Sequence, residues 1–150
     1  MSSEVPAELK EKVQRILAAN WKTEIDGSGV GDFFIRGEST GCHVMLEGGW
    51  GPKKESNLVH LLSFVLWDVP ITEELLTFIA EGGTRYFGSL SLQRNEDGTG
   101  DLILTHTLLG DFLDSEELNI ALASVFFGAD FLDDELQGRF GGRRTIDPID

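Results

Sequence analysis

The most constraining feature of the sequence is an apolar run at residues 57–69, NLVHLLSFVLWDV. Side chains alternate between the two faces of a strand, and in this run both faces are apolar. One face carries Leu58, Leu62, Phe64 and Leu66, and the other carries Val59, Leu61, Val65 and Trp67. A strand of this kind must be covered on both faces. The chain therefore needs either its own helices or a second polypeptide to cover the sheet.

Helical spacing of apolar side chains predicts an amphipathic first helix in PAELKEKVQRILAAN, residues 6–20, with Pro6 in the first turn. A short second helix is expected in ITEELLTFIAEGG, residues 71–83. There Thr72 is a candidate N-cap, and two glycines mark the end.

A long last helix is expected to begin at Asp114, which precedes Glu117 by three residues, the spacing of a capping box. Its apolar positions continue to Leu136, and a break near Gly128 is left open. Phe126, Phe127 and Phe131 make its apolar surface wider than contact with a single sheet needs.

Five segments are expected to form strands: DFFIR, CHVMLE, NLVHLLSFVLWDV, TRYFGSLSLQR and DLILTHTLLG. The loops GESTG and NEDGTG carry hairpin-turn residues, and a short extended piece is expected at residues 21–25. The order is therefore α-β-β-β-α-β-β-α. This predicts one α+β domain over residues 1–150, with a five-stranded, mainly antiparallel sheet. Its core covers about residues 6–137, and an Arg/Gly-rich tail follows at 138–150.

Charge restricts the partners that this chain can bind. Twenty-six acids against twelve bases give a net charge of -14, which disfavours nucleic acid and anionic membranes. The one basic cluster, Arg139, Arg143 and Arg144, is expected to be a solvated terminus. Cys42 is the single cysteine, and no secretory signal or membrane span is visible, so we expect a soluble cytoplasmic protein.

GESTG matches the G-x-S-x-G pattern of hydrolases, and Asp68 and His106 follow Ser39 in the order of a catalytic triad. A nucleophile elbow requires a strand followed by a helix, whereas this motif lies between two expected strands. A serine hydrolase using Ser39 is therefore kept only as a remote alternative.

Three further motifs lack the context that their chemistry requires. GSGVG, residues 27–31, opens a strand rather than a helix, so a flexible connector is expected instead of a phosphate loop. NEDGTGD lacks the final glutamate of a calcium loop, because Leu104 occupies that position. The three histidines show no metal-ligand spacing. We predict no catalytic residue, no metal and no cofactor.

GGWGPKK, residues 48–54, places Trp50 in a segment that we expect to be a loop. Trp50 either folds back over the core as a lid or contacts another chain. Together with residues 57–69 and the Phe-rich last helix it indicates excess apolar surface, which usually marks an interface. The residues predicted to contact a partner or a second subunit are Phe33, Ile35, Trp50, Val65 and Trp67.

The order of elements, the size and the acidity resemble the YbjN-like proteins, which share the type III secretion chaperone-like fold. The likeness spans Pro6 to about Gln137 and is clearest in the helix at Thr72–Glu81 and in the hairpin RYFGSLSLQRNEDGTGDLILTH. The Arg-rich tail departs from the family pattern.

The resemblance implies a homodimer without enzymatic activity that holds extended client segments against apolar patches and strand edges. It also implies an adaptor role in bacterial signal transduction, motility or stress response. The alternative is a regulatory domain that senses a small ligand in a pocket beneath Trp50 and Trp67.

Overall fold

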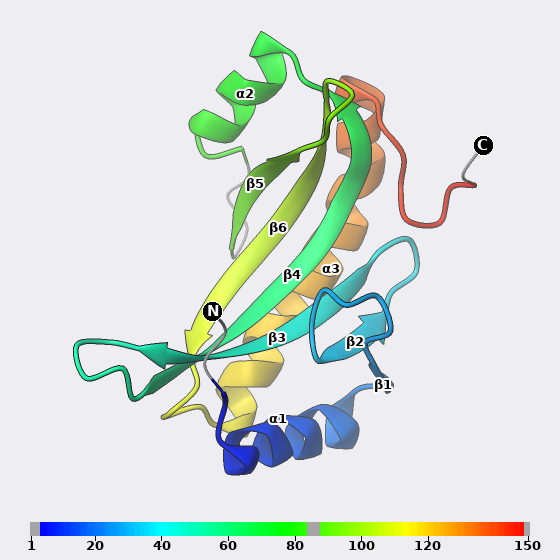
Figure 1. The fold of residues 1–150 in the computed structure, drawn as a ribbon. Helices are drawn as coiled ribbons and strands as arrows, with labels where there is room; N and C mark the ends of the chain where they lie inside the picture. The colour runs from blue at the N-terminus through cyan, green and yellow to red at the C-terminus, as the bar shows by residue number, and fades with distance from the viewer. Residues whose placement is uncertain (1–3, 84–87, 149–150) are drawn as a thin grey trace.

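The computed structural model describes residues 4–83 and 88–148. Within them, helices α1 (Ala7–Asn20), α2 (Glu73–Ala80) and α3 (Ser115–Phe140) accompany one sheet (Figure 1). The strands are β1 (Thr23–Ile25), β2 (Phe33–Arg36), β3 (Gly41–Trp50), β4 (Ser56–Pro70), β5 (Ser89–Arg94) and β6 (Thr99–Leu109). All neighbouring strands are antiparallel, in the order β1-β2-β3-β4-β6-β5. The predicted α+β class is confirmed.

The described sheet has six strands, one more than the sequence predicted. The additional strand is β1, which lies in the expected connection and pairs through Thr23↔Ile35 and Ile25↔Phe33 with β2. Three residues are too few to show alternation, so only the partner strand identifies them as a strand. Residues 84–87, which begin the expected fourth strand, lie outside the described residues.

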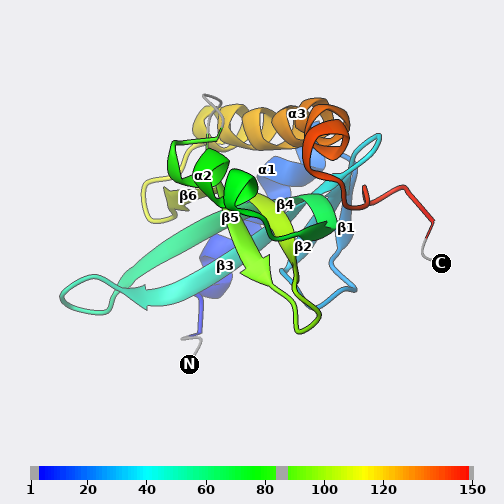
Figure 2. The same ribbon diagram turned by 90° about the horizontal axis from the view of Figure 1, so that it is seen from above.

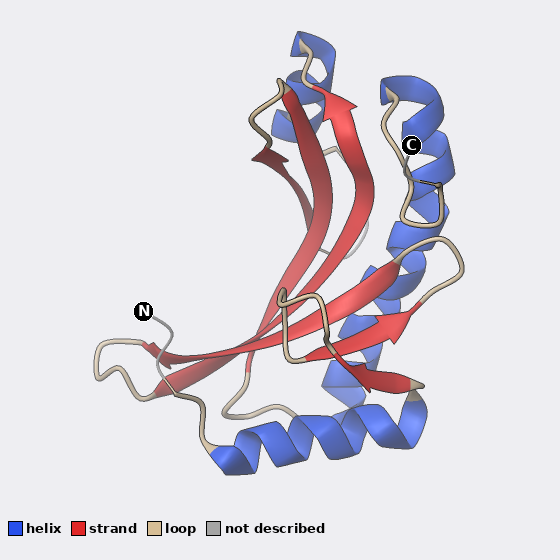
Figure 3. Cartoon of the chain, turned by 45° about the vertical axis from the view of Figure 1, so that its right-hand side comes forward, coloured by secondary structure: helices blue, strands red, loops and turns tan. Residues whose placement is uncertain are grey.

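Two helices cover one face of the sheet. α3 runs along the sheet over β3, β4 and β6, and α1 packs beside the first half of α3 (Figures 2 and 3). The core between these layers contains Leu17, Leu61, Leu104 and Leu122, each completely buried. We call the opposite face of the sheet the open face. Alternation directs Phe34, His43 and Phe64 towards it.

The predicted helix starts are confirmed. The Thr72 hydroxyl accepts a hydrogen bond from the Leu75 amide, and the Asp114 carboxylate accepts one from the Glu117 amide. α3 is not broken at Gly128. This glycine is buried against β6, where an added Cβ would lie 3.4 Å from Leu104, at ordinary van der Waals distance.

The expectation that residues 48–54 exclude regular structure is wrong in part. β3 continues to Trp50, which pairs with Ser56 after a bulge beginning at Glu47. Gly49 adopts a φ of 80°, which a glycine accommodates without steric cost. The turn itself covers residues 51–54. Trp50 therefore lies at the end of a long hairpin that projects from the body of the molecule (Figure 1).

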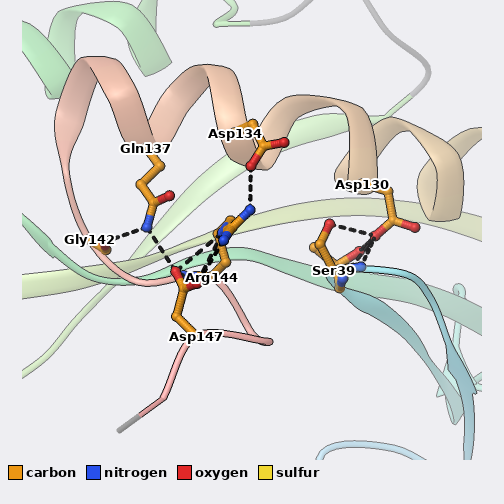
Figure 4. A network of polar contacts seen from close by, with 8 residues as sticks. Ser39, Asp130, Asp134, Gln137, Gly142, Arg144 and Asp147 are labelled. Carbon is orange, nitrogen blue, oxygen red and sulfur yellow. Dashed lines mark hydrogen bonds and ion pairs between the residues drawn. The ribbon is translucent and has the colours of Figure 1, made fainter. Parts of the chain in front are cut away.

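The loop between β2 and β3 is attached to α3 by one carboxylate. Asp130 accepts hydrogen bonds from the amides of Glu38, Ser39 and Thr40. It also accepts them from the hydroxyls of Ser39 and Thr40 (Figure 4). Gly37 fits beneath it because an added Cβ would lie 2.8 Å from an oxygen of Asp130. Asp130 thereby fixes the predicted hairpin against the helix.

Residues 141–147 do not form the solvated terminus that the sequence predicted. α3 continues to Phe140, and residues 141–147 return to the sheet, where Arg143 forms a β-bridge with Trp67. Arg144 forms ion pairs with Asp134 and Asp147 (Figure 4). Arg143 and Arg144 are held in place because β4 presents Asp68 and α3 presents Asp134 beside them.

Asp133 lies one turn of helix beyond Asp130 and has no solvent exposure. Among the described residues neither of its carboxylate oxygens has a hydrogen-bond partner. Burial raises the pKa of Asp133 above 3.8, although the nearby Ser39 hydroxyl and the charge of Arg144 partly oppose this shift. The ionised form therefore destabilises the fold.

We expect Asp133→Asn to raise the free energy of unfolding near neutral pH by about 1 kcal/mol, because leaving a buried carboxylate without hydrogen bonds costs ~1–3 kcal/mol. The gain should disappear as the pH falls below 3.8, where the carboxyl group is protonated in both folded and unfolded chains. Urea unfolding at about pH 7 and about pH 3 measures both values. The exposed Glu135→Gln is the control, and a loss of stability in Asp133→Asn near neutral pH would contradict the prediction.

Candidate functional site

A small apolar cavity opens on the open face of the sheet. Its volume is about 200 Å³. It is lined by Ser28, Val30, Phe34, Gly41, His43, Phe64, Trp67 and Thr145. We call it the aromatic pocket, because four of these residues carry rings. Its walls come from the β1–β2 loop, from β2, β3 and β4, and from the C-terminal segment.

A bulge in β4 creates one wall of the aromatic pocket. In a regular strand, residues 64 and 67 would face opposite sides. The register between β4 and β6 shifts after Phe64, so Val65 and Leu66 are both completely buried. Phe64 and Trp67 consequently lie on the same face and stack with a centroid distance of 4.2 Å and an interplanar angle of 7°.

His43 forms the floor between the remaining rings. Its imidazole lies 4.8 Å from the ring of Phe34 and 5.6 Å from that of Phe64, measured between centroids. Its Nδ1 is 2.6 Å from a carboxylate oxygen of Asp26. His43 is thus a buried, hydrogen-bonded histidine.

Asp26 also organises the loop over the pocket. It accepts hydrogen bonds from the amides of Ser28 and Gly31 and from the Ser28 hydroxyl. Burial opposes its ionisation, but these bonds and the one to His43 outweigh that effect and lower its pKa below 3.8. The loop GSGVG is thus held by a carboxylate whose role no sequence motif indicated.

The aromatic pocket continues into a wider, shallower groove. This groove has a volume of about 380 Å³ and shares Ser28, Phe34 and His43 with the pocket. It reaches Glu24 and Arg36 near the β1 edge of the sheet. An extended chain lying along it would pass from β4 across β3 and β2.

The structure separates the five residues that the sequence predicted as partner contacts. Trp67 lines the aromatic pocket. Trp50 is 48% exposed but pairs with Ser56, which precedes Trp67 by roughly 35 Å of β4. The two tryptophans therefore share no pocket, and that form of the ligand-sensing alternative is wrong.

Phe33, Ile35 and Val65 have at most 2% exposure and belong to the core between the sheet and the helices. The interface prediction is wrong for these three residues, because α1 and α3 already cover them. Phe34 and Phe64, which adjoin these residues in the sequence and point to the open face, line the pocket instead. Alternation along β2 could have indicated Phe34, whereas Phe64 depends on the bulge.

Within the described parts of the chain, Ser39 is not placed in a catalytic triad with Asp68. Its hydroxyl donates to a carboxylate oxygen of Asp130 at 3.2 Å instead of to a histidine. Asp68, the expected acid of the triad, lies 3.6 Å from Arg143. The elbow geometry is missing because the motif connects two strands, as the sequence predicted.

Two other side chains that could carry chemistry, Cys42 and Asp97, have structural roles. Cys42 is completely buried in β3, and burial raises the pKa of its thiol to about 12, which leaves the unreactive thiol form. Asp97 of the expected turn accepts hydrogen bonds from the amide and hydroxyl of Thr99. Among the described residues no group of three or more His, Cys, Asp or Glu side chains is placed to hold a metal.

The pocket and groove therefore provide apolar binding surface. Residues 7–148 match the family model described as T3SS (YopN, CesT) and YbjN peptide-binding chaperone 1, or TY-Chap1. The chain belongs to the TY-Chap1 family. The match confirms the resemblance to YbjN-like proteins with the secretion-chaperone fold. It also reaches residue 148, which corrects the expectation that the Arg-rich tail departs from the family pattern.

A search of curated proteins found no match to this TY-Chap1 chain. Within the described residues, none of the helices is sufficiently long and apolar to cross a membrane.

We expect Asp26→Ala to lower the free energy of unfolding by about 1–3 kcal/mol near neutral pH, because His43 and the loop amides lose their acceptor. Asp26 stabilises the fold above pH 3.8, and this contribution is lost as the pH falls through the lower pKa of the folded chain. The free energies of unfolding of Asp26→Ala and of the unmodified protein should therefore become equal in acid. Hydrogen exchange at the Gly31 amide measures the local effect.

Asp97→Ala is the matched control, since it removes a similar turn that lies outside the pocket lining. Equal protection of the Gly31 amide in Asp26→Ala and in the unmodified protein would show that Asp26 does not hold the loop.

Proposed function

We propose that this protein is a non-enzymatic, peptide-binding chaperone that holds an extended client segment across the open face. One apolar side chain of the client occupies the aromatic pocket. The observation that carries this proposal is a cavity lined by four rings on the face of the sheet that α1 and α3 leave uncovered. Membership in a family of peptide-binding chaperones supports it.

The pocket suits a single side-chain anchor. A volume of about 200 Å³ suits one aromatic or long aliphatic side chain. Burial of such a side chain contributes about 1.5–3 kcal/mol, and edge or stacking contacts with the rings add ~0.5–1.5 kcal/mol. This is too little for stable binding alone. Contacts of the client backbone along the groove must supply the remainder, as in other modes of extended-peptide recognition.

The charge of the protein favours basic clients. A net charge of -14 attracts positively charged segments and repels acidic ones before contact. Such steering mainly raises the rate of association and is weakened by salt. The anchor would then determine how long the client stays bound.

We expect Trp67→Ala to weaken binding of a fluorescein-labelled twelve-residue peptide, with terminal lysines and one central phenylalanine, by about tenfold or more. Tenfold corresponds to about 1.4 kcal/mol, which is within what a lost aromatic wall removes. Fluorescence anisotropy measures the affinity, and circular dichroism verifies the fold.

Two controls accompany this experiment. Trp50→Ala is the matched protein variant, because it removes the same side chain far from the pocket. Replacing the central phenylalanine of the peptide by alanine should lower affinity for the unmodified protein but change little for Trp67→Ala. Equal affinity of both proteins for both peptides would refute the pocket as the client site.

We further propose that the protein forms a homodimer through the tip of the β3–β4 hairpin. Trp50 is 48% exposed there, and Lys53 and Lys54 follow it in the turn. Leu109 and Phe112, 44% and 80% exposed, lie at the same end of the sheet. An apolar tip with two cations is complementary to the acidic surface of a second copy.

We expect Trp50→Ala to keep its fold, because the side chain is half exposed, and to convert the dimer to a monomer. Sedimentation velocity measures the mass, and Trp67→Ala should remain dimeric. If Trp50→Ala is instead destabilised like a core deletion and still sediments as a dimer, Trp50 covers its own subunit.

An adaptor role towards a bacterial signalling or stress-response protein is part of this proposal. The buried, unpaired Cys42 suits a reducing cytoplasm. Comparing the proteins captured from a bacterial lysate by the unmodified chain and by Trp67→Ala identifies the clients that require the pocket.

A further inference from the structure

The second half of β4 has an edge that is open to another strand. β3 accompanies β4 only as far as the pair His43↔Leu62, whereas β4 continues to Pro70 beside β6. Among the described strands none is paired with the other edge of β4 beyond this point. Unpaired backbone groups on such an edge are a template for an added strand.

The C-terminal segment of the chain occupies part of this edge. The Trp67 amide donates to the Arg143 carbonyl at 2.7 Å, and the Arg143 amide donates to the Trp67 carbonyl at 2.8 Å. These reciprocal bonds are those of an antiparallel strand pair. The indole Nε1 of Trp67 also donates to the Thr145 hydroxyl at 3.0 Å, so the segment contacts the wall of the aromatic pocket.

Side chains outside the pocket hold the segment in place. Arg144 contacts Asp134 of α3 at 2.5 Å and Asp147 at 2.8 Å, and Gln137 donates to the Gly142 carbonyl (Figure 4). The guanidinium of Arg143 lies 3.6 Å from Asp68. Two arginines of an extended segment thus face carboxylates that the folded domain presents.

We propose that the β4 edge at Trp67 is a strand-addition site for basic, extended client segments, and that residues 141–147 occupy it until a client displaces them. The segment itself indicates the chemistry of the client, because GGRRTID pairs by its backbone and places its cations against Asp68 and Asp134. This inference rests on the proposed peptide-binding function.

Residues 141–147 are covalently attached to the domain, and this attachment favours the state in which they are bound to the β4 edge. A tethered segment acts at an effective concentration of roughly millimolar, so it excludes weak free peptides. A client must therefore either bind more tightly or meet the fraction of molecules in which the segment has detached, which lowers its apparent affinity by that fraction.

A substitution at Gly142 would loosen the segment without altering the four rings of the aromatic pocket; of the pocket lining, only Thr145 belongs to the segment. Gly142 has a φ of 88°, and an added Cβ would lie 2.8 Å from both the Trp67 carbonyl oxygen and a methyl group of Val69. Gly142→Ala in the full chain should therefore move the segment away from β4. Gly138→Ala is the matched control, because an added Cβ there meets no atom within 4 Å.

The probe is a fluorescein-labelled peptide with the sequence of residues 141–150, GGRRTIDPID, compared with the same peptide carrying serines in place of both arginines. We expect Gly142→Ala to bind the arginine peptide about tenfold or more tightly than the unmodified protein and Gly138→Ala do. The Trp67 amide should exchange faster in Gly142→Ala and regain protection when the peptide is added. Arg144→Gln, which loses two ion pairs outside the pocket, should act in the same direction.

Equal peptide affinity in all four proteins would overturn the inference, as would a Trp67 amide that exchanges rapidly in Gly142→Ala without any gain in binding. Equal binding of the serine peptide would overturn the preference for basic segments. The twelve-residue peptide with a central phenylalanine distinguishes failure of the strand-addition inference from failure of the proposed peptide-binding function. If it binds through Trp67 while Gly142→Ala changes nothing, only the present inference fails, whereas no binding by any variant refutes peptide binding itself.

Discussion

The bulge in β4 is the constraint on which the other features depend. It turns Val65 and Leu66 together into the core and places Phe64 and Trp67 together on the open face. Both faces of β4 are apolar, and α3 covers one side of the strand. On the other, the β1–β2 loop and the C-terminal segment enclose the rings without filling the space between them.

Carboxylates hold the loops that surround this strand. Asp26 binds the loop over the pocket, Asp130 binds the β2–β3 hairpin to α3, and Asp134 and Asp147 bind Arg144 of the C-terminal segment. These four carboxylates thus have local structural partners in addition to their contribution to the long-range field. Asp133 is the exception: it is buried beside them, its carboxylate makes no hydrogen bond among the described residues, and burial raises its pKa.

Local patterns were enough to predict most of the fold. Helical spacing identified α1, capping residues identified the starts of α2 and α3, and alternation identified β3 and its hairpin. These signals act within a few residues, so they are present in the sequence. β1 was missed as a strand because its identity depends on pairing with β2. The site was predicted only in part: Trp67 was found, but Phe33, Ile35 and Val65 were assigned to the wrong surface.

The sequence by itself determined the α+β class, the family resemblance, and the need to cover both faces of β4. Only the tertiary structure decided which residues meet at the pocket and that residues 141–147 return to Trp67. The physical reason is that both outcomes depend on pairing across the sheet. A shift of one residue in that register exchanges the faces to which every later side chain points, and no local pattern records such a shift.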